Sequence, residues 1–271
     1  MSFLLVLLAL ATASLGALGG LGGAVILVPL LVLSGTPARE AAPLGLLSVA
    51  SGSLAAGPRQ LAELTVHHRL GVTSETLASV GAVTGALLSG AFGETLLTRL
   101  LAVVAVAAAV ASLRGRDETH ALGAEGDDDD LGEQRGTLSG AVRTDGVVYR
   151  YRARNLPGGL AAMALAGLVA GIAGASGGFI KTPATSEIMR VPVKVAAATT
   201  TFTIGITSAA ALLVFAVHGR INLGDAGPVI AGSLIGGQLG ARLQAGLEPT
   251  IIRRALAAVL VVVALILFVQ A

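Results

Sequence analysis

The sequence predicts an all-α, polytopic membrane protein with about eight transmembrane helices in two homologous halves. Three observations predict this class. Hydrophobic residues make up 54% of the chain and charged residues 13%, whereas a soluble domain carries about 25% charged residues. Long apolar segments recur along the chain, and matching motifs occur in the same order before and after a polar stretch. Lipid is therefore the expected solvent for most of the surface.

The apolar segments define the expected spans. They lie at about 2–34, 41–66, 72–93, 96–113, 157–189, 194–217, 223–247 and 250–270. Most approach the roughly 20 residues that cross the hydrocarbon core as a helix, and they alternate too little for barrel strands. We expect the first segment to span the membrane rather than to be a cleaved leader, because it lacks a basic N-terminal region.

The chain is predicted to have three parts. Residues 1–113 form a first membrane repeat of about four spans, and residues 156–271 form a second repeat of about four spans. Residues 114–155 form a hydrophilic, acidic linker between them. Four spans in each half give repeats that run in the same direction, whereas an odd number gives inverted repeats. The sequence leaves the number open.

The first segment of each half is predicted to be broken. As one helix, each would be about 50 Å long, against a hydrocarbon layer of about 30 Å. Each carries a glycine cluster followed by a proline, in "GLGGAVILVP" and "GASGGFIKTP". We expect helix breaks at Pro29 and Pro183, since glycine admits irregular backbone and proline disrupts a helix. Matched interruptions indicate a transport site, and the expected substrate-binding glycines are Gly22, Gly23, Gly177 and Gly178.

Lys181 stands inside the second of these broken segments, and Thr182 follows it. A lysine at the centre of a membrane helix costs about 2.5–3.5 kcal/mol, so it is usually paired, snorkelling or functional. A nucleotide loop is excluded, because the P-loop pattern needs glycine where Ala175 and Ile180 stand. Two interpretations remain: a lysine that snorkels or pairs with Glu187, or a cation that meets an anionic substrate at a half-helix start.

Hydroxyl groups recur on one face of the segment at 194–217. Thr199, Thr203 and Thr207 follow one another at intervals of four residues, which places them on one helix face. They are typical either of helix–helix packing or of neutral donors along a path for an oxyanion. Under the second interpretation, Thr199 and Thr203 join Lys181 and Thr182 as substrate-binding residues.

The repeated motifs resemble those of a known family. The two glycine–proline stretches are each followed by a basic turn, "TPAREAA" and "VPVKVAA", and then by a short loop, "VHHRLGV" and "VHGRINL". In this order they resemble the TauE/SafE-type sulfite exporter family, also called TSUP. The resemblance implies a multi-pass transporter in the cell membrane that moves sulfite, thiosulfate, sulfoacetate or other sulfonates, driven by the proton gradient. Ala24 and Ser176 depart from it, because each stands where a glycine is expected.

We therefore expect a secondary transporter of a small sulfur-containing oxyanion, coupled to protons. An anion channel, or a transporter of an unrelated organic anion, is left open. A membrane-embedded enzyme would need an intramembrane Ser–His pair, two opposed aspartates or an H-E-x-x-H motif, and the sequence shows none of these. We expect no enzymatic activity.

Composition limits the partners. The chain has no cysteine and four histidines, three of which lie at the repeated loops, so neither a metal site nor a cofactor is expected. The net charge is +2, with two tyrosines and no tryptophan, which argues against nucleic acid. The expected partners are a small anion, protons and the lipid bilayer. The oligomeric state is left open, with a homodimer among the options.

Overall fold

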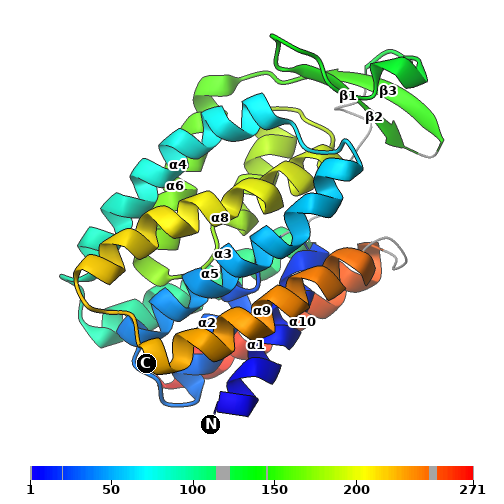
Figure 1. The fold of residues 1–271 in the computed structure, drawn as a ribbon. Coiled ribbons are helices and arrows are strands. Elements are labelled where there is room, and N and C mark those ends of the chain that lie inside the picture. Colours follow the sequence, from blue (N-terminus) through cyan, green and yellow to red (C-terminus); the bar gives the residue numbers. More distant parts are fainter. Residues whose placement is uncertain (1, 20, 114–122, 145, 244–248, 271) are drawn as a thin grey trace.

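The computed structural model describes residues 2–19, 21–113, 123–144, 146–243 and 249–270. Before the linker the helices are α1 (Ser2–Gly19), α2 (Ala24–Leu33), α3 (Ala38–Ala62), α4 (His68–Ser89) and α5 (Glu94–Leu113). After it come α6 (Leu156–Ala173), α7 (Gly178–Pro183), the π-helical turn η3 (Ala184–Ile188), α8 (Val193–Val217), α9 (Leu223–Leu243) and α10 (Pro249–Gln270). The all-α class is confirmed (Figure 1).

The linker carries the only sheet within the described residues. It holds a short 3-10 turn, η2 (Asp128–Asp130), and the strands β1 (Gly132–Glu133), β2 (Ser139–Thr144) and β3 (Val147–Arg152), which pair antiparallel in the order β1-β2-β3. By length and composition, four described helices can cross a membrane: α3, α5, α6 and α8. Shorter apolar helices lie at Phe3–Leu18, Ala24–Leu33 and Leu256–Val269.

The glycine cluster of the first half turns the chain back on itself. Gly23 lies against the middle of α1, where a Cβ on it would be 2.7 Å from the Ala13 Cα. From there α2 runs for 10 residues, about 15 Å or half of the hydrocarbon layer. The first predicted segment is therefore one crossing followed by a half-length return.

Corresponding helices of the two halves make corresponding contacts. Helix α1 packs along α9, as α6 packs along α4; α3 and α8 contact each other at the centre, and α5 contacts α10 (Figure 1). Small residues allow the close crossings. A Cβ on Gly232 or Gly236 would collide with carbonyl oxygens of α1, and one on Gly81 or Gly85 would collide with carbonyl oxygens of α6. The sequence interpretation of these glycines as packing residues agrees with their positions.

The two halves run in opposite directions. Helix α3 begins on the side where Arg39 donates to the Phe92 carbonyl and where the Ala38 amide donates to Glu94 over 2.8 Å. Helix α8 begins on the opposite side, where Lys194 reaches the Arg143 carbonyl of the sheet. The repeats are therefore inverted, because the half-length return adds a fifth helix to each half.

The sheet docks where α4 begins. The Arg69 amide donates to the Glu133 carboxylate over 3.3 Å, and His68 Nδ1 lies 3.4 Å from a Glu133 oxygen. His67 caps α4 by accepting from the Leu70 amide, and its ring meets the Tyr151 ring edge-on. Burial lowers the pKa of His67, and the nearby Glu133 carboxylate partly offsets this effect. We call this side of the molecule the sheet side.

The close crossing of α9 over α1 gives a test. Gly236→Ala places a methyl group against the Leu10 carbonyl, and we expect it to lower the free energy of unfolding by about 1–3 kcal/mol. Gly227→Ala in the same helix meets nothing within 4 Å, and it should be neutral or stabilising by about 0.5–1 kcal/mol. Unfolding of the two variants in the same detergent measures the difference. Equal stabilities would show that α9 does not lie this close to α1.

Candidate functional site

The two glycine breaks meet at the centre of the molecule. Ser176, in the second break, donates from its hydroxyl to the carbonyls of Leu21 and Gly22 in the first break; the contact to Gly22 is 3.2 Å. Gly22 has φ +79°, and a Cβ on it would run into the Ser176 side chain. Ser176 therefore satisfies backbone oxygens that no helix satisfies, in a region where an unpaired polar group is costly.

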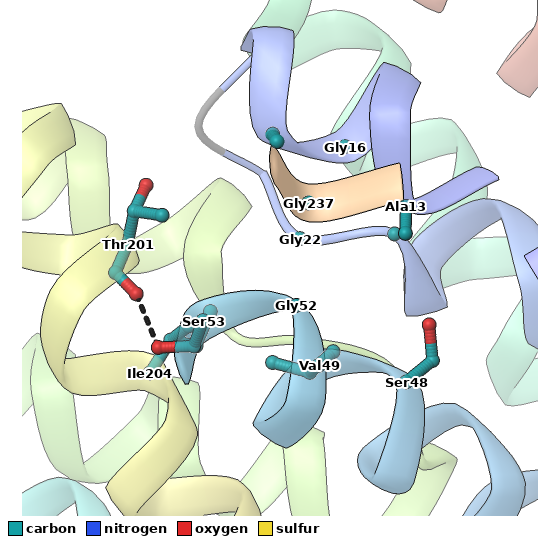
Figure 2. Close-up of a pocket in the computed structure, with 12 residues that line it drawn as sticks. Ala13, Gly16, Gly22, Ser48, Val49, Gly52, Ser53, Thr201, Ile204 and Gly237 are labelled. Carbon is teal, nitrogen blue, oxygen red and sulfur yellow. Dashed lines mark hydrogen bonds between the residues drawn. The ribbon is translucent and has the colours of Figure 1, made fainter. Parts of the chain in front are cut away.

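A small cavity lies beside the first break. Its volume is about 20 Å³, and it is lined by residues of α1, the break, α3, α8 and α9, among them Gly22, Gly23, Ser48 and Ser53 (Figure 2). Ser53 donates to the Thr201 carbonyl over 2.6 Å, as the dashed line in Figure 2 marks. A cavity of this size holds about one water molecule. This cavity is too small for an oxyanion in this conformation.

A buried charged cluster joins the two halves. Lys181 Nζ on α7 lies 2.8 and 3.0 Å from the two carboxylate oxygens of Glu75 on α4. Thr207 on α8 donates to Glu75 and accepts from Lys181. Lys181 is 1% exposed and Glu75 is 3% exposed. Three helices thus join one cation, one carboxylate and one hydroxyl away from solvent.

Glu187 is not the partner of Lys181. It lies exposed in η3, whereas Lys181 pairs with Glu75, a residue that the sequence interpretation missed. One feature of the sequence could have indicated Glu75. Glu75 shares the face of α4 that holds Gly71, Ala78 and Gly85, all buried, at spacings of four, three and ten residues. A carboxylate in the small-residue face of a helix needs a buried partner.

The predicted threonine face joins α8 to α4. The His67 amide donates to Thr199 Oγ1 over 3.0 Å, and Gly71 lies against the Thr203 methyl group. One turn further, Thr207 meets Glu75. The spacing of four residues matches on the two helices, so the hydroxyl face ends at the charged cluster. Thr199 and Thr203 themselves do not line the central cavity.

The remaining predicted residues lie around these two features. Gly22 and Gly23 line the cavity, Gly177 caps α7, and Gly178 and Thr182 are buried beside Lys181 in that helix. Pro29 as a helix break is wrong: it lies inside α2, and the glycines before the helix make the break. Pro183 ends α7, where the hydrogen bonding changes to the π-helical turn η3. A proline lacks the amide that an α-helix needs at that position.

The arrangement defines a class of protein. Inverted halves, broken helices and buried polar groups between them are typical of secondary transporters. A family model described as sulfite exporter TauE/SafE matches residues 5–267, which is nearly the whole chain. The chain belongs to this family of membrane transporters, as its motifs predicted. Comparison with curated proteins and with solved structures found no significant match.

Contact between the breaks can be tested at Gly22. Gly22→Ala adds the cost of a left-handed backbone, about 1–2 kcal/mol, and also a clash with Ser176. Gly35→Ala has the same backbone cost, with φ +95°, but nothing lies within 4 Å. We expect Gly22→Ala to lower the thermal unfolding temperature more than Gly35→Ala does, and we expect this difference to shrink when both variants are compared in a Ser176→Gly background. If the difference in unfolding temperature between Gly22→Ala and Gly35→Ala were the same with and without Ser176→Gly, the contact would be contradicted.

Proposed function

We propose that the protein is a secondary transporter that moves a small sulfur-containing oxyanion, such as sulfite, thiosulfate, sulfoacetate or another sulfonate, across the cell membrane together with protons. Family membership supports a membrane transporter of the sulfite exporter type. The observation that carries the proposal further is the buried cluster of Lys181, Glu75 and Thr207. In this cluster Lys181 supplies a cation that can bind the anion, and Glu75 supplies a carboxylate that can carry the proton.

The cluster suggests how anion and proton are coupled. A buried ion pair is often no more stabilising than apolar residues of similar size, so folding alone gives little reason for this one. When Glu75 is protonated, Lys181 loses its counter-charge, and an oxyanion can take the place of the carboxylate. Thr207 can then donate to the anion in a charge-assisted hydrogen bond. Anion binding and protonation thus favour each other.

The breaks supply the rest of the proposed path. The closed cavity at Gly22 and Gly23 must widen before an anion can pass, and irregular glycine backbone permits that movement. We place the amides of Gly177 and Gly178 and the Thr182 hydroxyl next to the bound anion, at the half-helix that carries Lys181. Thr199 and Thr203 then lie where α4 contacts α8. We place the path of protons to Glu75 along this contact.

Transport in proteoliposomes tests the role of Lys181. Lys181→Met removes the cation that faces the anion, and we expect the transport rate of radiolabelled sulfite or thiosulfate to fall at least tenfold. Lys194→Met is the matched control, because this lysine is exposed on the sheet side. Glu75→Gln should keep anion exchange and lose its acceleration by a pH gradient, because the carboxamide cannot carry the proton.

A double variant separates transport from folding. Lys181→Met alone leaves the Glu75 carboxylate buried without its partner, which costs about 3–5 kcal/mol. Glu75→Gln added to Lys181→Met removes that charge and should restore folding without restoring transport. If the folded double variant transported the oxyanion at the normal rate, the cluster would be structural and the proposed site would be wrong.

A further inference from the structure

A second hollow lies outside the membrane helices, at the sheet side. Its volume is about 430 Å³, far larger than the central cavity. It is lined by β3 and Arg154 after it, by the start of β2 and nearby linker residues, and by Arg190 between η3 and α8. Four of its lining residues are arginines: Arg150, Arg152, Arg154 and Arg190. This volume falls in the range of small-ligand sites.

Within the described part of the chain, the positive charge of this hollow is mostly unbalanced. Arg150 is neutralised by Asp130, whose carboxylate lies 2.6 Å from its guanidinium. Among the residues that the structure describes, Arg152, Arg154 and Arg190 have no carboxylate within 4.0 Å. None of the described lining residues is acidic, although the neighbouring η2 turn holds three aspartates. We call the group of Arg152, Arg154 and Arg190 the arginine pocket.

The backbone holds these arginines in place. The Arg154 amide donates to the Met189 carbonyl over 2.8 Å, which ties the end of the sheet to the end of η3. Arg190 is exposed between Met189 and Val191, both fully buried. Its φ is +55°, an unfavourable conformation for a residue with a Cβ. Backbone strain of this kind occurs preferentially at functional sites.

We infer that the arginine pocket is a second anion site, which binds an oxyanion of the sulfate or phosphate type. Guanidinium groups bind such oxyanions with paired, charge-assisted hydrogen bonds. The oxyanion group is either a free anion or the headgroup of an anionic lipid, because the pocket adjoins the start of α6 at the membrane surface. The site is separate from the Lys181 cluster and does not rest on the transport proposed above.

Binding to the purified full-length protein tests the free-anion source. In neutral detergent, at constant ionic strength, calorimetric titration with sulfate and with inorganic phosphate should show a site that persists in the double variant Lys181→Met, Glu75→Gln. Arg154→Gln combined with Arg190→Gln should weaken it at least tenfold. Arg135→Gln is the control, because Arg135 is an exposed arginine of the same sheet region outside the pocket.

Arg190→Gly tests anion binding in a variant that we expect to fold normally. It removes the guanidinium and also relieves the left-handed backbone, so the unliganded protein should be at least as stable as the wild type while anion binding falls. The lipid source is tested in nanodiscs of phosphatidylcholine with and without phosphatidylglycerol. If the headgroup is the ligand, phosphatidylglycerol raises the unfolding temperature of the wild type more than that of Arg190→Gly.

Binding of a free anion or of a lipid headgroup supports the site, and the calorimetric and nanodisc experiments distinguish the two ligands. The inference is overturned if sulfate and phosphate fail to bind and phosphatidylglycerol affects wild type and Arg190→Gly equally. It is also overturned if the double arginine variant binds as tightly as Arg135→Gln. Because the double variant Lys181→Met, Glu75→Gln isolates this pocket, failure of anion binding here leaves the proposed transport site untouched, and loss of transport in that variant leaves the pocket untouched.

Discussion

Irregular backbone inside a membrane must be covered by protein, because lipid offers no hydrogen-bond partners. The rest of this structure depends on how the two breaks meet that constraint. Ser176 donates to the Leu21 and Gly22 carbonyls, so each half covers the break of the other. The close packing of α1 on α9 and of α4 on α6 brings the two breaks together at the centre. The movement proposed for transport therefore requires these contacts to separate.

The scaffold is nearly symmetric, whereas its charge is not. Lys181 aligns with Leu27, which is also fully buried but lies in the apolar core. Glu75 of the first half aligns with Ala226 of the second, so the related pair of positions, Leu27 and Ala226, carries no charge. Inverted halves supply two related conformations of one scaffold, and the anion site proposed above lies at the single charged cluster. The buried charges therefore occupy only one of the two related positions in the scaffold.

Much of the fold was predictable, because membrane segments and repeats leave long, regular signals. Glycine clusters at matching places predicted broken helices, and the structure shows both breaks. The predicted helix break at Pro29 was wrong, since a proline can lie inside a short helix when neighbouring groups donate to the carbonyl that it leaves without a partner. Glu75 was missed because its role depends on Lys181, which lies 106 residues away in the chain. A long-range pair of this kind leaves no local pattern.

The sequence by itself determined the all-α membrane class, the two related halves, the glycine breaks and the family, since each follows from composition or from motifs in order. Only the tertiary structure decided the rest. It showed that the two halves are inverted, because the direction of α2 depends on how Gly23 packs against α1. It gave Lys181 its partner on α4 and closed the centre to a cavity of about 20 Å³. Both results come from packing between helices that are distant in the chain.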